Sequence, residues 1–160
     1  MGFRGLELAV CSVLAIFAAT AFAADTQYVS QKGSWILNKA ETKVPAGGFV
    51  PVDTPTVVTL DDGKALKFVV YVMTSTGLQP SITYEGAYDG KPYAYGQDAT
   101  RSFMHVSANS FRADTKANDG ASSSEVVTFS AGNTKMRAEG KYMDAKGKTY
   151  DYVEVWDKLQ

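Results

Sequence analysis

His105 is the only histidine in the 160-residue chain, and it is the first side chain to test for acid–base or metal chemistry. It lies in the alternating run 101–106, where Phe103 shares its face. A catalytic triad would also need a carboxylate and a nucleophile within about 3 Å. Neither of the flanking serines, Ser102 and Ser107, lies in a nucleophile-elbow context. We therefore expect His105 to be a polar residue of a strand wall.

Carboxylates are the second group that could do acid–base chemistry, and they are spread along the whole chain. Asp62, Asp89 and Asp119 are each followed directly by glycine, which is typical of turns. We expect most of the others to lie in turns or at outward-facing strand positions. A glycosidase would need two carboxylates about 5–10 Å apart across a cleft, and the sequence predicts no such pair. The other carboxylates from residue 85 onward are Glu85, Asp98, Asp114, Glu125, Glu139, Asp144, Asp151, Glu154 and Asp157.

Four tyrosines lie close together in "YEGAYDGKPYAYG". Tyr84 and Tyr88 share one face of a predicted strand, and Tyr93 and Tyr95 share one face of the next. The four rings could form cross-strand aromatic pairs that hold a hairpin together. Alternatively, they could line a partly wet cavity or a sugar-stacking surface, because tyrosine combines an apolar body with a polar tip.

The elements that must position these side chains are short runs of β-branched and aromatic residues that end at turn dipeptides. No stretch has convincing helical periodicity. Because the connections are short, a meander is the simplest topology, and closure would remove its two exposed edges. We predict an all-β fold, an antiparallel up-and-down β-barrel of about 8–10 strands. The predicted strands are 35–41, 56–60, 65–74, 81–88, 93–96, 101–106, 110–115, 123–130, 134–143 and 149–157.

One long loop is predicted at residues 42–55, which contain three prolines and two glycines. Long loops often act as lids over a binding site. A plain connection across one end of the barrel explains the same composition equally well, so both interpretations stay open.

The first 24 residues have the pattern of a secretory signal peptide. Arg4 supplies a positive charge, residues 8–22 are almost wholly apolar, and Ala21-Phe22-Ala23 has the small-x-small cleavage pattern. The apolar run is shorter than the roughly 20 residues that a transmembrane helix needs. We expect a signal peptide at residues 1–24 and one mature domain at residues 25–160. The mature protein would be periplasmic or secreted, without stable insertion in a membrane.

Composition limits the chemistry and the partners. The single cysteine, Cys11, lies in the predicted leader, so the mature protein would have no thiol nucleophile and no disulfide. One histidine without cysteine is a poor basis for a metal site. The formal net charge is −1 and no basic cluster occurs, which argues against nucleic-acid binding. We predict no metal, no cofactor and no enzymatic activity.

The stretch "GSWILNKAE" contains a Gly-x-Trp pattern and resembles the first strand of lipocalins and related calycins. Together with "YEGAYDGKPYAYG" and "MDAKGKTYDYVEVWDK", it resembles small exported bacterial lipocalin-like proteins, mostly of unknown function. The resemblance covers most of the mature chain and implies a closed barrel. It also implies that Trp35 plugs one end, with a basic residue across its ring. Lys158 is the candidate by position, and Arg137 is the alternative.

The last predicted strand alternates imperfectly, so two orientations are possible. In the first, Val153 and Val155 face the core, and Tyr152, Glu154 and Trp156 face outward as an association surface. In the second, the aromatic residues, Tyr150 included, face inward and the valines face outward against a neighbour.

The predicted fold leads to a functional hypothesis, because a barrel of about eight strands can hold one small ligand. We expect non-enzymatic binding of a small, largely apolar molecule, with His105 and Arg101 orienting it. The alternative is an envelope or protein-interaction module with a filled barrel core, and cavity volume distinguishes the two. The predicted cavity residues are Phe68, Val70, Tyr71, Met73, Tyr84, Phe103 and Met104.

Overall fold

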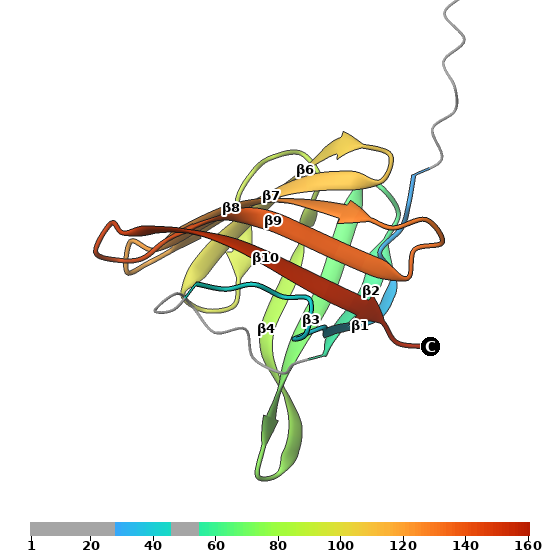
Figure 1. Cartoon of the computed structure of the whole chain (residues 1–160), viewed down its shortest axis with the longest axis horizontal. Coiled ribbons are helices and arrows are strands. Elements are labelled where there is room, and N and C mark those ends of the chain that lie inside the picture. Colours follow the sequence, from blue (N-terminus) through green and yellow to red (C-terminus); the bar gives the residue numbers. More distant parts are fainter. Residues whose placement is uncertain (1–27, 46–54) are drawn as a thin grey trace, which may run out of the picture.

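Ten antiparallel strands form a closed barrel in the computed structural model, which describes residues 28–45 and 55–160 (Figure 1). Each strand pairs with the next along the chain, and β1 pairs with β10 to close the barrel. The predicted antiparallel up-and-down barrel is confirmed. The strands are β1 (Gly33–Leu37), β2 (Thr56–Asp61), β3 (Ala65–Thr74), β4 (Gly77–Ala87), β5 (Tyr93–Tyr95), β6 (Ala99–Ser107), β7 (Ser110–Ala117), β8 (Ser122–Phe129), β9 (Lys135–Met143) and β10 (Thr149–Lys158).

Two sequence predictions fall outside the described residues. These are the signal peptide at residues 1–24 and most of the long loop at residues 42–55. Within the described ranges, no helix is long and apolar enough to span a membrane.

The turn between β2 and β3 shows why the strands end where the sequence predicts. The Asp62 carboxylate accepts hydrogen bonds from the backbone N–H groups of Lys64 and Ala65, at 2.9 and 2.8 Å. Gly63 adopts φ = 80°, a left-handed conformation that glycine reaches without a Cβ clash. The Asp-Gly pair therefore reverses the chain and begins β3 in register with β2.

Irregular pairing bends two strands of the barrel. The register shifts between Val58 and Leu60 in β2, and again between Val70 and Tyr71 in β3. Such shifts increase local twist and turn a strand away from its sheet. Beyond the second shift, β3 and β4 continue as a hairpin that projects from the barrel (Figure 1). Its side chains include Met73, which is 68% exposed.

Trp35 lies at one end of the barrel and is 0% exposed. Its indole N–H donates a 2.7 Å hydrogen bond to the carbonyl of Gln31, and Lys158 Nζ lies 5.1 Å from the ring centroid. This is the geometry that the Gly-x-Trp resemblance implies. Beyond Trp35, the core is a cluster of aromatic rings: Phe68, Tyr84, Phe103, Phe111 and Phe129.

Residues 38–43 run along the edge of β10, where they continue the pairing of β1. The N–H of Asn38 donates to the carbonyl of Val155 at 2.7 Å, and Lys43 forms a bridge with Val153. Val155 is buried although it alternates with the inward-facing residues of β10. Tyr152, Glu154 and Trp156 face inward, which is the second of the two orientations that the sequence allowed.

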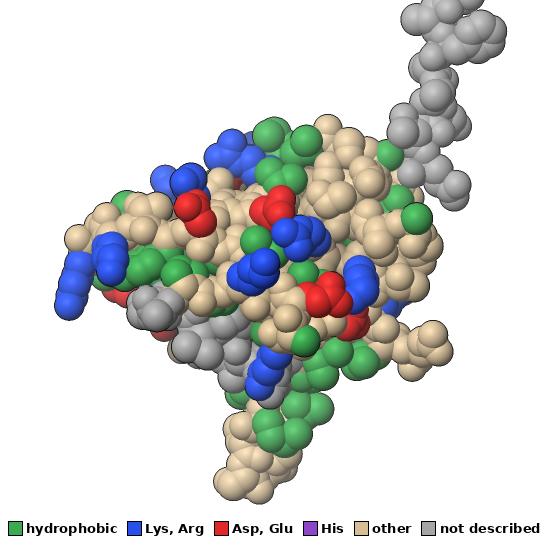
Figure 2. Space-filling model, in the orientation of Figure 1, with side chains coloured by type: hydrophobic (Ala, Val, Ile, Leu, Met, Phe, Trp, Pro, Cys, Tyr) green, Lys and Arg blue, Asp and Glu red, His purple; other side chains and the backbone are tan. Residues whose placement is uncertain are grey.

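The exposed face of β9 and β10 carries charges of both signs side by side (Figure 2). Arg137 pairs with Glu139 at 2.5 Å, and Lys141 pairs with Asp151 at 2.8 Å. Because the signs alternate in pairs, this face presents no patch of a single charge.

Candidate functional site

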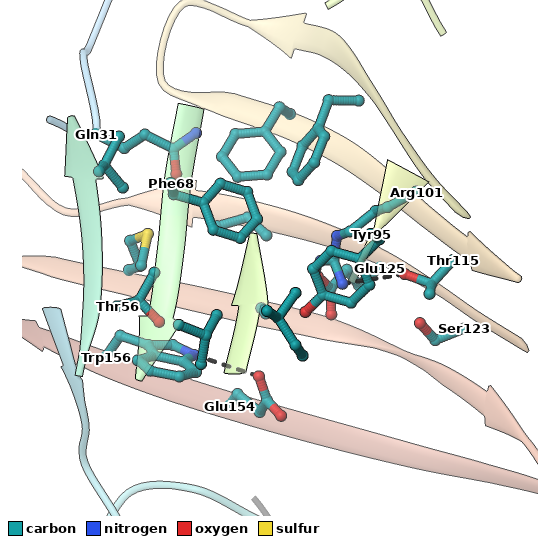
Figure 3. A pocket seen from close by; sticks show the side chains of 18 of the residues that line it. Gln31, Thr56, Phe68, Tyr95, Arg101, Thr115, Ser123, Glu125, Glu154 and Trp156 are labelled. Atoms are coloured by element: carbon teal, nitrogen blue, oxygen red, sulfur yellow. Dashed lines mark hydrogen bonds and ion pairs between the residues drawn. The ribbon is translucent and has the colours of Figure 1, made fainter. Parts of the chain in front are cut away.

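A cavity of about 440 Å³ lies inside the barrel (Figure 3). Strand alternation creates it, because every second residue of β3, β6, β8, β9 and β10 faces inward. Most of its wall is apolar. The apolar side chains are Val58, Phe68, Val70, Ile82, Phe103, Phe111, Val127, Met136 and Ala138.

A charged group lies on this wall. Arg101 of β6 forms an ion pair with Glu125 of β8, and its Nη1 donates to the hydroxyl of Thr115 at 3.0 Å. The hydroxyl of Tyr152 donates to the second carboxylate oxygen of Glu125. Both oxygens of Glu125 therefore have partners, as buried charges require.

The faces of the Arg101 guanidinium are also covered. Its central carbon lies 5.2 Å from the ring centroids of both Tyr95 and Phe103, a cation–π arrangement. Burial is the largest single influence and lowers the pKa of Arg101. Glu125, together with Tyr95, Tyr152 and Glu154, outweighs burial and keeps that pKa above its ordinary value. Arg101 is therefore charged and paired through Nη1 and Nη2, while its buried Nε has no hydrogen-bond partner among the described residues.

Gly140 of β9 makes room for this ion pair. It is paired with both Glu125 and Tyr152, and a Cβ at this position would lie 2.7 Å from the Cβ of Glu125 and 2.4 Å from the backbone oxygen of Ser124. Only a residue without a side chain allows β8 and β9 to approach so closely here.

Glu154 of β10 is a second carboxylate on the cavity wall (Figure 3). Its Oε2 accepts a 3.3 Å hydrogen bond from the indole N–H of Trp156. Burial raises the pKa of Glu154 to about 7, and the negative charge of Glu125 adds to this effect. Near neutral pH, Glu154 is therefore present in both its protonated and its ionised form.

The structure places four of the nine predicted ligand residues on the cavity wall: Phe68, Val70, Arg101 and Phe103. Tyr84 is not one of them, which corrects that assignment. It faces inward but lies in the aromatic core, stacked on Phe68 with ring centroids 5.2 Å apart.

Three further assignments to the cavity wall are wrong. Met104 follows the inward-facing Phe103, so it must face outward, and it is 49% exposed. Tyr71 and Met73 lie beyond the register shift in β3, where the chain leaves the barrel.

His105 also lies away from the cavity, at the end of the barrel that Tyr28 packs against, which we call the closed end. Its Nε2 is 3.0 Å from the carbonyl oxygen of Gly63, and its ring stacks on Tyr88 at a centroid distance of 4.1 Å. Tyr28 packs against it edge-on at 4.9 Å. His105 therefore helps to seal the end of the barrel instead of facing a ligand.

The sequence allowed two roles for the four clustered tyrosines, packing in the core and lining a cavity, and the structure shows both. Tyr84 and Tyr88 belong to the packed interior, while Tyr95 lines the cavity. Tyr93 is half-buried and donates a 3.1 Å hydrogen bond to Asp89.

Sequence reasoning missed Glu125 as a cavity residue, and it left open whether Tyr152, Glu154 and Trp156 face inward. Glu125 had a usable signal, because it shares alternation with Val127 and Phe129 and so faces the core. Among the residues with described positions, no group of three or more His, Cys, Asp or Glu side chains could hold a metal ion.

No protein-family model and no curated protein matches the sequence. A redesigned β barrel has 11% identity and a TM-score of 0.47, over 81% of this chain and 92% of that one. A proposed β-lactamase from Burkholderia vietnamiensis has 10% identity and a TM-score of 0.39, over 83% of this chain and 99% of that one. These similarities are too low to support a function, and they identify no lipocalin family. The closed barrel is shown by the strand pairing of this chain itself.

Proposed function

We propose that this protein binds one small, largely apolar molecule inside its barrel, without catalysing a reaction on it. The observation that carries the proposal is the cavity of about 440 Å³ with its mainly apolar wall. Small-molecule sites have volumes of about 300–1,000 Å³, apolar linings and a few placed polar groups. Protein interiors otherwise contain few voids larger than a water molecule.

Affinity would come from burial of the ligand's apolar surface against the cavity wall. Each buried methylene group contributes about 0.8 kcal/mol, so a chain or ring that follows the wall between Phe68 and Val127 gains several kcal/mol. The polar groups near Arg101 and Glu154 would set the orientation of the ligand.

The alternative, a filled barrel that acts only through its surface, requires a core without space for a ligand. The cavity volume favours the binding protein over this alternative. Export across the inner membrane of a bacterium is part of the proposal, and the N-terminal sequence pattern supports it.

A hydrolase is the third possibility, and the raised pKa of Glu154 is the feature that would suit it. The other cavity carboxylate, Glu125, is held by Arg101 and Tyr152. It therefore has no free oxygen to act as a nucleophile or to activate water. This occupancy favours binding without catalysis.

The test is native mass spectrometry of the protein purified from its own cell compartment, with a denatured sample beside it. We expect additional mass that disappears on unfolding. Two matched variants locate it: Val127→Phe fills the cavity, and Val126→Phe makes the same change on the outer face of β8. Val127→Phe should lose the additional mass, and Val126→Phe should retain it.

A wild-type mass with nothing bound, unchanged after incubation with fatty acids, fatty alcohols and isoprenoids, would contradict the proposal. Equal retention of ligand by both folded variants would place the ligand outside the barrel. Near-ultraviolet circular dichroism checks that each variant is folded.

A further inference from the structure

The charges on the cavity wall do not balance. Arg101 is the only basic residue among the described side chains that line the cavity, and Glu125 and Glu154 are the two acidic ones. Arg101 already pairs with Glu125, donates to Thr115 and is covered by two aromatic rings. Its ion pair is therefore with Glu125, and among the described residues no ion pair joins Glu154 to a cation.

Glu154 and Trp156 lie side by side on the cavity wall, next to the group around Arg101 (Figure 3). The described contacts of the Glu154 carboxylate include one hydrogen bond, from the neutral indole N–H of Trp156. The indole ring lines the same part of the cavity, and an aromatic face attracts a cation. One wall position thus offers a carboxylate and an indole together.

We propose that the ligand is an amine with an apolar body, whose protonated nitrogen binds Glu154 beside Trp156 while its body lies against the apolar wall. The inference rests on the proposed function, and it names the chemical class of the ligand. A hydrogen bond between an ammonium group and a carboxylate is about twice as strong as one between neutral groups. In this cavity, the ammonium would also supply the missing positive charge.

The same arrangement disfavours a fatty acid. A carboxylate head group would meet Glu154 and Glu125 with like charge, and Arg101, the one cation among the described wall residues, already forms an ion pair with Glu125. Leaving a charge unpaired in a cavity of low polarity is costly. A neutral alcohol avoids this cost but gains no attraction between opposite charges.

The groups that face Glu154 support this assignment. Glu125 comes from β8, Arg101 from β6, Tyr95 from β5 and Tyr152 from β10. The raised pKa of Glu154 is what a carboxylate shows when burial and a like charge outweigh the nearest cation. A protonated amine would reverse that balance and hold Glu154 ionised.

The experiment compares three probes with the same alkyl chain, decylamine, decanol and decanoate, by isothermal titration calorimetry at pH 8. We expect one decylamine per protein, about tenfold tighter than decanol, with decanoate the weakest. Glu154→Gln should remove the advantage of decylamine over decanol. Glu139→Gln, an equivalent change on the outer face of β9, should behave as wild type.

Equal binding of the three probes, or tightest binding of decanoate, would overturn the amine assignment while the proposed function stands. An amine preference that survives in Glu154→Gln would overturn the role of Glu154. Failure of all three probes to bind wild-type protein would instead contradict the binding function itself.

Discussion

Arg101 and Glu125 form an ion pair across β6, β7 and β8 inside the barrel, with side-chain exposures of 15% and 7%. Tyr152 from β10 donates to the same carboxylate, so the pair links opposite parts of the wall. It separates the apolar part of the cavity from Thr115 and Ser123, which line its polar part (Figure 3).

Removing one partner of this pair should destabilise the protein strongly. Arg101→Met leaves Glu125 charged and buried, and we expect it to lower the free energy of unfolding by about 3–5 kcal/mol. The double variant Arg101→Met/Glu125→Gln should recover part of that loss, because no unpaired charge remains. Urea unfolding of the two variants and wild type measures the difference. Equal stability of the single and double variants would contradict a coupled pair.

Lys158 over Trp35 should contribute modestly to stability. Lys158→Met keeps the alkyl stem and removes the ammonium group, and we expect a loss of about 0.5–1 kcal/mol. Lys146→Met, in the exposed turn before β10, is the control and should change stability little. If the two variants unfold at the same urea concentration, the cation–π contact contributes nothing.

Stability should depend on pH through Glu154. Its pKa of about 7 in the folded protein lies above the ordinary 4.5, so the folded state retains a proton that the unfolded chain releases between these values. Stability is therefore unaffected by Glu154 below about pH 4.5, falls as the pH rises to about 7, and stays lower above it.

Glu154→Gln removes this dependence. We expect the variant to match wild type near pH 4.5 and to exceed it by about 3 kcal/mol at pH 8. Chemical unfolding at both pH values tests this, with Glu139→Gln as the exposed control. A constant difference between Glu154→Gln and wild type across the range would show that Glu154 titrates normally.

Asp61 should hold the N-terminal segment over the closed end of the barrel. Its carboxylate accepts hydrogen bonds from the Gln31 N–H at 2.6 Å, the Tyr88 hydroxyl at 3.2 Å and the Tyr28 hydroxyl. Asp61→Ala leaves these donors unsatisfied, and we expect a loss of about 2–3 kcal/mol.

Hydrogen exchange gives the local measurement for this network. In Asp61→Ala, the amides of Val29 and Gln31 should exchange faster than in wild type. Asp151→Ala removes an exposed carboxylate paired with Lys141, and it should change both stability and exchange little. Unchanged protection at residues 28–32 in Asp61→Ala would contradict the role of Asp61.

The sequence predicted the barrel well because its strands end at strong turn signals. Asp62-Gly63 and Lys146-Gly147 reverse the chain where predicted, and β3 has the predicted bounds. The inward and outward alternation of side chains gave wrong cavity residues where the strand pairing is irregular. The shift after Val70 carries Tyr71 and Met73 out of the barrel, and Pro80, the partner of Tyr71, lies directly at this shift.

The polar part of the cavity was predicted poorly for a different reason. The sequence predicts that most carboxylates lie in turns or at outward-facing positions, because acidic residues are usually exposed, and it leaves the orientation of Glu154 open. The burial of Glu125 depends on Arg101 and Tyr152, which are distant in sequence. Such long-range contacts become visible only when the strands are assembled.

The central claim is that the ligand binds inside the barrel. Methyl nuclear magnetic resonance during a decanol titration tests this claim most directly, because it locates the bound decanol. Val70 and Val127 face the cavity, while Val106 and Val126 face solvent on the outer wall. We expect saturable shifts in the two inner valines and unchanged signals from the two outer ones. Shifts confined to the outer valines, or no saturable shift at any of the four, would contradict a binding site inside the barrel.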